Sequence, residues 1–420
     1  MDIESLYKVW LETRAISTDS RKIRENSIFF ALRGDHFDGN TFATQALELG
    51  ASYVVVDDES IVVLGDKRYI VVADVLTTLQ QLANKHRSTL TIPVLALTGS
   101  NGKTTTKELT RNVLSKKFKT HATEGNLNNH IGVPLTILST PVDAEFLIVE
   151  MGANHQGEID LLCKIAAPDY GMITNIGKAH LEGFGGVEGI KKGKSEMYRH
   201  LAKIGGKIFV NEDDDVLMSL VPQNALIIPY KVHEILNVIE DELTLNLEYG
   251  NSRFKTQLYG IYNLPNIAFA ICAGAYFGVE KSEIIEAIGE YVPDNNRSQI
   301  LKMGTNTIIK DAYNANPSSM ALSIESFCKM SGPKVAVLGD MLELGDFALP
   351  EHIKIINLAS DMDFVDVIFI GRQFCLAGNG QKGNYFENIE QAKQYFQNKN
   401  YQNSTILLKG SRGIGVEKIL

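Results

Sequence analysis

Residues 98–105, TGSNGKTT, have the composition and spacing of a phosphate-binding loop. Gly99 and Gly102 permit a tight turn in which backbone N–H groups surround a phosphate, and a helix that begins there adds its positive dipole end. Lys103 can place its ammonium group on the terminal phosphates, and the Thr104 hydroxyl can bind Mg²⁺. The usual loop carries one more glycine, five positions before Gly102, where this chain has Leu97. Despite that departure, the segment predicts a nucleoside triphosphate site.

Two later apolar runs end in side chains that could bind a divalent cation. Glu150 ends the run FLIVE, and His180 and Glu182 follow the run that ends in TNIG. Carboxylate oxygens and imidazole nitrogens suit such an ion beside phosphates. A lone His or Glu is usually solvated, but open α/β sheets bind their ligands beyond the carboxyl ends of their strands. These three side chains are therefore candidate metal ligands.

Three further segments could bind a ligand, although their residues alone leave the matter open. Lys191, Lys192 and Lys194 lie in GIKKGKSEMY, where the spacing is typical of a solvated helix face. Polar side chains are dense at 125–134 (GNLNNHIGVP) and 311–319 (DAYNANPSS), and turn chemistry explains such density as well as binding does.

The candidate loop lies among elements that can position it. The short apolar run VLAL at 94–97 precedes it, and a helical pattern at 105–114 follows it. Further buried strands are predicted at 146–152, 170–177 and 206–211. Strands that alternate with helices predict a doubly wound parallel sheet of the P-loop type. Period-two alternation at 242–260 predicts a local antiparallel element, and 266–279 reads as a buried helix.

The chain on either side predicts two more α/β units. A small N-terminal unit is expected from strands at 27–32, 53–57 and 69–74 and a helix at 41–51. A C-terminal, Rossmann-like parallel sheet is expected from strands at 306–312, 334–340, 365–371 and 404–410. The fold class is therefore α/β with three domains, and we place them at 1–86, 87–294 and 295–420.

Composition excludes several classes of protein. The 420 residues carry 41 Lys and Arg against 50 Asp and Glu, a net charge of −9, which disfavours nucleic-acid coats and basic membrane binders. The four cysteines, Cys163, Cys272, Cys328 and Cys375, form no CxxC pair and are expected to be reduced thiols. No secretory leader or membrane-spanning run is visible, so a cytoplasmic protein is expected.

Six segments in order make the chain resemble the Mur ligases of peptidoglycan synthesis. They are TGSNGKTT, EMGANHQGEI, TNIGKAHLEGFG, YNLPNIAFA, KDAYNANPSSM and LGDMLELG, and the resemblance extends to the N-terminal STDSRKIRENSIFFALRGDHFDGNTFA. Within the family, the chain is most similar to the ligases that join D-Ala-D-Ala to UDP-MurNAc-tripeptide. The resemblance implies ATP-dependent amide bond formation through an acyl phosphate, in a cytoplasmic monomer.

The resemblance also implies roles for the metal ligands and the phosphate loop. Lys103 would contact the β- and γ-phosphates, Thr104 would hold a first Mg²⁺, and Glu150 and His180 would hold a second. Lys194 matches a lysine that these ligases carry as a carbamate formed from CO₂, although Lys191 and Lys192 lie close to it. The residues implied for ATP are Gly99, Ser100, Asn101, Gly102, Lys103, Thr104, Thr105, Asn263, Asn266, Arg297, Asp311, Tyr313 and Asn314.

Two further sets follow from the resemblance. The residues implied for the UDP-sugar substrate are Ser20, Arg21, Ala31, Leu32, Arg33, Gly34, Asp38, Gly39, Asn40, Asn126, Asn128 and Asn129. The residues implied for the incoming dipeptide are Lys409, Gly410, Ser411 and Arg412. The family members that add the third peptide residue share the first motifs but usually carry Asp-Asn-Pro-Arg in the last domain, where DAYNANP stands here. A folylpolyglutamate synthase would not need residues 1–86, and a nucleotide switch or an inactive scaffold would not turn over amino acids.

Overall fold

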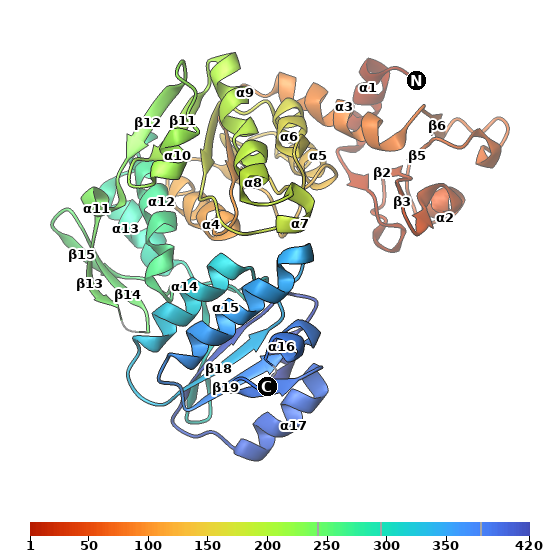
Figure 1. Ribbon diagram of the computed structural model, residues 1–420. Coiled ribbons are helices and arrows are strands. Elements are labelled where there is room, and N and C mark those ends of the chain that lie inside the picture. Colours follow the sequence, from red (N-terminus) through yellow and green to blue (C-terminus); the bar gives the residue numbers. More distant parts are fainter. Residues whose placement is uncertain (242, 295, 379) are drawn as a thin grey trace.

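The chain forms three α/β units, each built around its own sheet (Figure 1). The computed structural model describes residues 1–241, 243–294, 296–378 and 380–420. The first unit has a parallel sheet in the order β1-β2-β5-β6, which confirms the expected strands. Its strands are β1 (Ile16–Ser17), β2 (Ile28–Phe30), β5 (Tyr53–Val56) and β6 (Tyr69–Val71). Helices α1 (Ile3–Thr13) and α2 (Ala43–Glu48) and the hairpin of β3 (Arg33–Gly34) and β4 (Phe37–Asp38) complete it.

The central sheet contains six parallel strands in the order β12-β11-β10-β7-β9-β8, which confirms the doubly wound arrangement. The strands are β7 (Val94–Thr98), β8 (Thr120–Ala122), β9 (Phe146–Glu150), β10 (Tyr170–Ile173), β11 (Lys207–Asn211) and β12 (Leu226–Tyr230). Strand β7 is buried along its whole length because helices cover both faces: Leu95 and Leu97 pack in one buried cluster, and Val94 and Ala96 in another.

Helices connect these strands and fix the edge at which the candidate loop lies. Helix α4 (Lys103–Leu114) follows β7 through that loop. The other helices of the unit are α5 (Gly132–Leu138), α6 (Glu158–Ala166), α7 (Leu181–Phe184), α8 (Val187–Lys194), α9 (Glu196–Ile204), α10 (Asp215–Ser219), α11 (Val232–Ile235), α12 (Leu264–Tyr276) and α13 (Lys281–Glu290). The predicted buried helix is confirmed as α12.

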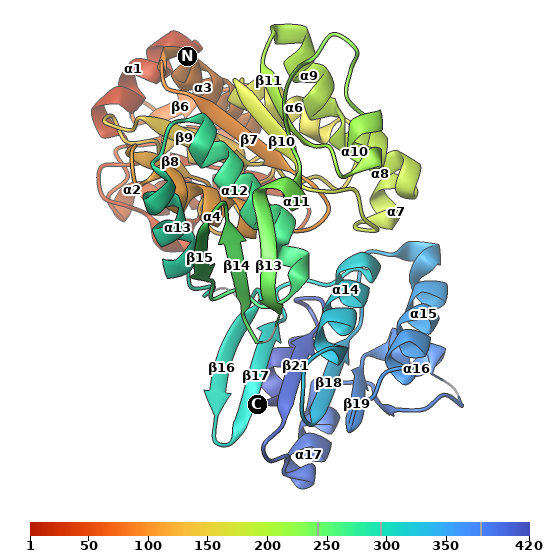
Figure 2. The same cartoon turned by 90° about the vertical axis from the view of Figure 1, so that its left-hand side faces the viewer.

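A three-stranded antiparallel sheet extends from the central unit (Figure 2). It consists of β13 (Leu236–Asp241), β14 (Leu245–Tyr249) and β15 (Ser252–Lys255). The expected antiparallel element at 242–260 is present as β14 and β15, and residue 242 lies outside the described chain. The first strand, β13, was not predicted because its residues do not alternate cleanly.

The C-terminal sheet has the order β16-β17-β21-β18-β19-β20. Its strands are β16 (Gln299–Met303), β17 (Asn306–Asp311), β18 (Lys334–Gly339), β19 (Asp366–Ile370), β20 (Asn384–Phe386) and β21 (Thr405–Lys409), and its helices are α14 (Pro317–Cys328), α15 (Ala348–Ser360), α16 (Arg372–Ala377) and α17 (Ile389–Lys399). The expectation of a wholly parallel sheet needs one correction, since β16 pairs antiparallel with β17. A tight turn joins the two strands, and so short a link permits only antiparallel pairing.

Helix α3 (Val75–Thr89) joins the first unit to the central one. The buried guanidinium of Arg87 donates from Nε to Ala166 O (2.9 Å), and from Nη2 to Ala167 O (2.9 Å) and Asp169 Oδ2 (3.0 Å). It thereby satisfies carbonyl groups at the end of α6 that have no partner within that helix. The boundaries at 86 and 294 stay predictions, and the first falls inside α3. Within the described residues, no helix is long and apolar enough to span a membrane.

His86, on α3, makes the packing of α1 sensitive to pH. Its ring lies 4.5 Å from that of Trp10 between centroids, and burial followed by the charge of Arg14 lowers its pKa from 6.5 to about 4. The unfolded chain therefore takes up the proton first. The stability that neutral His86 contributes is complete above pH 6.5 and is lost as pH falls toward 4, by on the order of 3 kcal/mol.

We expect the emission of Trp10, the single tryptophan, to change as the pH falls through about 4, where His86 in the folded protein takes up its proton. The His86→Phe variant should lack that transition, because it has no group to protonate. A fluorescence titration of both proteins measures the effect, and identical transitions in the two would refute it.

Candidate active site

A cavity of about 1030 Å³ lies at the carboxyl ends of the central strands and is closed on one side by the C-terminal unit. It brings together most of the predicted nucleotide residues, from segments far apart in the sequence. Those that line it are Ser100, Asn101, Gly102, Lys103, Thr104, Thr105, Asn263, Asn266, Arg297, Asp311, Tyr313 and Asn314. Asn126, Asn128, Asn129, Glu150, His180 and Lys409 line it too. The cavity thus lies at the strand ends, where the sequence predicts the site.

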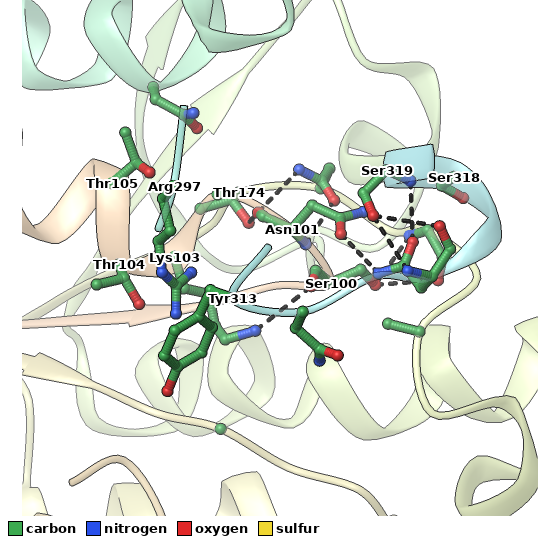
Figure 3. A pocket seen from close by; sticks show the side chains of 18 of the residues that line it. Ser100, Asn101, Lys103, Thr104, Thr105, Thr174, Arg297, Tyr313, Ser318 and Ser319 are labelled. Carbon is green, nitrogen blue, oxygen red and sulfur yellow. Dashed lines mark hydrogen bonds between the residues drawn. The ribbon is translucent and has the colours of Figure 1, made fainter. Parts of the chain in front are cut away.

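The loop between β7 and α4 has a shape that depends on Gly102. This residue caps α4 with φ at 79°, in the left-handed region, and a Cβ there would lie 2.5 Å from Asn266 Oδ1. Asn101 is held by the residues just after the neighbouring strand β10, since Thr174 Oγ1 donates to Asn101 O (2.6 Å) and Asn175 Oδ1 accepts from Asn101 N (3.1 Å). Figure 3 shows Thr174 and Asn101 side by side. The loop is thus fixed with α4 beginning at its end.

Lys103 folds back onto its own loop. Its Nζ donates to Gly99 O at 2.7 Å, and the side chain is partly buried. Burial lowers the pKa of Lys103, Glu150 acts in the opposite direction, and the charge of Arg297 lowers it further. Arg297 lies beside Lys103 and over the ring of Tyr313, with its Cζ 3.9 Å from the ring centroid (Figure 3). Two cations therefore face the cavity where an anionic phosphate chain would offset their repulsion.

Glu150 is a buried carboxylate at the end of β9, only 1% exposed. Thr104 Oγ1 donates to its Oε2 (2.9 Å), and Asn128 Nδ2 donates to its Oε1 (2.8 Å). Its backbone N–H donates to Thr123 Oγ1 at 3.0 Å. Two neutral donors hold the carboxylate in place without neutralising its charge, which suits a cation ligand.

Lys194 differs from the two other lysines of its helix. Lys192 is exposed and Lys191 pairs with Glu188 at 2.7 Å, whereas Lys194 is fully buried. Its Nζ has no hydrogen-bond acceptor among the described residues and lies 5.4 Å from the ring centroid of Phe184. Burial, together with the charge of Lys103, holds the pKa of Lys194 well below its usual value. A buried amine without an acceptor is costly unless its chemistry is used.

These side chains fit Mg²⁺, which takes one or two carboxylates and completes its shell with phosphate oxygens and water. Within the part of the chain that the structure describes, no three His, Cys, Asp or Glu side chains converge. Thr104, Glu150 and His180 instead line the cavity as separate donors that could contact such an ion. Such a sparse set is appropriate for a cation that arrives with a nucleotide.

The C-terminal unit contributes contacts that the sequence did not reveal. Asn316 Nδ2 donates to Asn101 Oδ1 at 2.7 Å, across 215 positions of the chain. Lys178 pairs with Glu351 at 2.8 Å, and the side chains of His180 and Glu343 are in direct contact. His180 lowers the pKa of Glu343 through this hydrogen bond. The segment LGDMLELG, which includes Glu343, belongs to the family resemblance, but the sequence alone indicates no role for any of its residues.

Asn263 and Asn266, two of the residues expected to bind ATP, line the cavity but are already bonded within the protein. Asn263 Nδ2 donates to Tyr259 O at 2.8 Å, and Asn266 Nδ2 donates to Asn263 Oδ1 at 2.9 Å. Thr106 Oγ1 donates to Asn266 Oδ1 at 3.0 Å. This network ties the start of α12 to α4, so the asparagines fix one wall of the cavity.

The residues expected to hold the UDP-sugar divide into two groups. Asn126, Asn128 and Asn129 line the cavity, whereas Ser20, Arg21, Ala31, Leu32, Arg33, Gly34, Asp38, Gly39 and Asn40 lie in the first unit, outside it. Arg33 and Asn40 converge on Asp57, at 2.9 and 2.8 Å. Asp57 was missed, although it is the last residue of a predicted strand. Arg21 is exposed and pairs with Asp19 at 2.8 Å.

The four residues expected near the dipeptide are mostly engaged elsewhere. Lys409 is buried and pairs with Asp311 at 2.6 Å. Ser411 is buried, donates from Oγ to Ala315 O (3.3 Å) and accepts from Leu342 N (3.0 Å), and Gly410 packs against the backbone of Gly339. Arg412 is exposed, with its Cζ 5.5 Å from the ring centroid of Tyr313. Of these four residues, Arg412 alone has an exposed charged group that could meet the carboxylate of a ligand.

Breaking the buried Lys409–Asp311 pair should strongly destabilise the C-terminal unit. Replacing Asp311 by asparagine leaves the Lys409 charge buried, and we expect unfolding to become easier by about 3–5 kcal/mol. The double variant Asp311→Asn, Lys409→Met should recover much of the loss. Denaturant unfolding of the three proteins without nucleotide measures this, and a single variant as stable as the parent would contradict it.

Comparisons with known proteins agree with this geometry. Three family models match in order: "Mur ligase family, catalytic domain" at 12–87, "Mur ligase middle domain" at 97–274 and "Mur ligase, glutamate ligase domain" at 296–412. A UDP-N-acetylmuramoyl-tripeptide–D-alanyl-D-alanine ligase of Bacillus subtilis (strain 168) is 34% identical, over 96% of this chain and 92% of that protein.

Two solved structures are similar over nearly the whole chain. A crystal structure of MurF from Acinetobacter baumannii has a TM-score of 0.88 and 30% identity, and covers 98% of this chain and 96% of its own. The MurF ligase of Thermotoga maritima in complex with ADP has a TM-score of 0.84 and 28% identity, and covers 97% and 96%. The sequence motifs, the fold and these matches lead to one conclusion: the chain belongs to the Mur ligase family.

Proposed function

We propose that this protein is an ATP-dependent ligase that joins D-Ala-D-Ala to UDP-MurNAc-tripeptide in peptidoglycan precursor synthesis. The observation that carries the proposal is one cavity that holds Lys103 on a phosphate loop, the buried Glu150 and the facing Arg297. The full-length likeness to ligases of that name supports the choice of substrates. We further propose that it acts in the cytoplasm, because ATP and nucleotide sugars are cytoplasmic. We also propose that it is a monomer, as the resemblance to the family implies.

The proposed reaction has two steps. An oxygen of the tripeptide carboxylate attacks the γ-phosphorus of ATP, ADP leaves, and an acyl phosphate forms. The amine of D-Ala-D-Ala then attacks the acyl carbon, loses a proton, and inorganic phosphate departs with the C–O bond electrons. The first step brings two anions together, and Lys103 and Arg297 supply the fixed positive charge that offsets this repulsion. The C-terminal unit covers the cavity and excludes water from the acyl phosphate.

Two Mg²⁺ ions belong to this proposal. Thr104 would hold the first, and Glu150 and His180 the second. When bound, such ions neutralise charge on the transferring phosphoryl group. The neutral Lys194 amine would add to the carbon of CO₂ and lose a proton, which gives a carbamate. That anion would suit the cation site and accounts for the buried amine that has no acceptor.

The substrates would occupy different parts of the molecule. The uridine end of the UDP-sugar would lie on the first unit near Arg33 and Asn40, and its peptide would pass Asn126, Asn128 and Asn129. Arg412 would attract the carboxylate of the dipeptide. Lys409 and Ser411, with their buried bonds, would shape that subsite and not bind charge directly.

The test is phosphate release from ATP and Mg²⁺ with UDP-MurNAc-tripeptide, in the presence and absence of D-Ala-D-Ala. Release should require both, and mass spectrometry should show the pentapeptide product. Both the meso-diaminopimelate and the lysine tripeptide should be supplied. Release with UDP-MurNAc-dipeptide and a diamino acid instead would assign the protein to the preceding ligation. ATP binding without substrate-dependent release would overturn the proposal.

A further inference from the structure

Glu343 and His180 face each other across the boundary between the C-terminal and central units. Glu343 lies in the loop between β18 and α15, and His180 immediately precedes α7. Their side chains are in direct hydrogen-bonding contact, through His180 Nδ1 and Glu343 Oε2. The Glu343 side chain is 55% exposed, so water offers it an alternative partner. Because water competes for the Glu343 carboxylate, this contact depends on a backbone that holds both residues in place.

The backbone at both residues is unusual. His180 has φ at 55° and Glu343 has φ at 62°, both in the left-handed region that side chains other than glycine seldom adopt. Such conformations cost free energy and persist where the surroundings enforce them, often at functional sites. Two of them meet here, and their side chains point at one another.

Contacts on both sides hold the Glu343 loop against α7. Glu182 N donates to Glu343 O at 3.3 Å across the boundary. Within the C-terminal unit, Met341 N donates to His352 Nε2 (3.1 Å) and Leu342 N donates to Ser411 Oγ (3.0 Å). The loop is therefore a fixed element of the C-terminal unit, and it reaches His180 only when that unit is docked as in this structure.

The chemistry of the contact selects one form of the imidazole. An ionised carboxylate can only accept hydrogen bonds, so His180 Nδ1 carries the hydrogen. In the neutral ring, Nε2 then keeps its lone pair, free for a cation. Histidines that bind metals commonly donate their other N–H to a carboxylate, and this bond sets the tautomer and the ring orientation.

We infer that Glu343 is a positioning residue for His180, through which docking of the C-terminal unit completes the metal site. The inference rests on the proposed function in one respect, the role of His180 as a metal ligand. Glu343 itself contacts no metal or substrate in this assignment. Glu343 links the position of the C-terminal unit to the metal affinity of the central unit. The cation is therefore held firmly only when the C-terminal unit closes the cavity.

The test measures Mn²⁺ binding to the full-length protein in the presence of ADP, by the electron paramagnetic resonance signal of free Mn²⁺. Loss of the carboxylate in Glu343→Ala should weaken Mn²⁺ binding by at least about tenfold, the usual range for such partners of metal ligands. Glu343→Gln keeps an acceptor oxygen and should remain within about threefold of the parent.

Two control variants separate positioning from other effects. Asp346→Ala removes the same charge from an exposed residue three positions along the loop, and should bind Mn²⁺ as the parent does. Glu351→Gln weakens the Lys178 ion pair that docks the C-terminal unit, without touching His180, and should have a smaller effect than Glu343→Ala.

Three outcomes would overturn the inference. Parental affinity in Glu343→Ala would show that the carboxylate does not position His180. Tighter binding would show that Glu343 competes with the metal for the ring. An equal loss of Mn²⁺ affinity in Asp346→Ala would show that the removal of any negative charge from this loop is enough to explain the effect. Because the assay contains no peptide substrate, a failure of the ligase reaction would leave these results interpretable and would count against the proposed function alone.

Discussion

Replacing Lys103 by alanine should lower kcat by on the order of a thousandfold. This is the upper end of the loss seen when one fixed donor that stabilises transition-state charge is removed. The residue begins α4 and its ammonium now rests on Gly99 O, a bond that a phosphate oxygen can replace. Lys103 is the single lysine of residues 98–105. The measurement is ATP- and substrate-dependent phosphate release at saturating substrates.

The fold should survive the Lys103 substitution, because the side chain lies at the cavity wall and not in an apolar core. Thermal unfolding of the variant should therefore match that of the parent. Lys192→Ala, an exposed lysine of the central unit, is the control and should keep full activity. A Lys103→Ala protein with more than a tenth of the parental kcat would remove Lys103 from the proposed mechanism.

Replacing Lys194 by methionine should abolish activity while the structure is preserved. Methionine fills nearly the same buried volume and cannot react with CO₂. We expect a loss of at least about a hundredfold, as for other charged groups that act on a transferring phosphoryl group. In the parent, removal of CO₂ and bicarbonate should lower activity, and added bicarbonate should restore it.

Carbon-13 NMR gives a second readout that does not depend on catalysis. With ¹³C-labelled bicarbonate, a carbamate signal should appear in the parent and be absent from Lys194→Met. Lys191→Met and Lys192→Met change the same helix on its exposed side and should keep both the signal and the activity. Bicarbonate-independent activity together with an absent signal would leave Lys194 as an ordinary buried amine.

The sequence predicts the parts of this molecule in which local pattern determines structure. The β7–loop–α4 unit follows from an apolar run, two glycines and a helical period, and the edge at which Glu150 and His180 gather follows from the geometry of parallel strands. Recognised motifs extended that prediction to Arg297 and Tyr313, which lie beside Lys103.

The residues that sequence reasoning missed act between units. Asn316 reaches Asn101 over 215 positions, and Glu343 reaches His180 over 163, so no local pattern connects either pair. Lys409 shows the opposite error. Its motif suggested a ligand-binding cation. Lys409 is instead buried and paired with Asp311, because strands β17 and β21 are neighbours in the sheet and place the two residues opposite each other. Pairing partners depend on tertiary packing, which a single sequence does not specify.

The hydrogen bonds of Arg87 have a consequence for dissecting the protein. The residues that line the cavity begin at Ser100, which suggests that a shortened chain could retain the nucleotide site. Without α3, however, Ala166 O and Ala167 O would lose the guanidinium that now satisfies them, and an apolar face of α5 and α6 would be exposed. A fragment that starts after residue 90 should therefore aggregate, and expression trials should keep the first ninety residues attached.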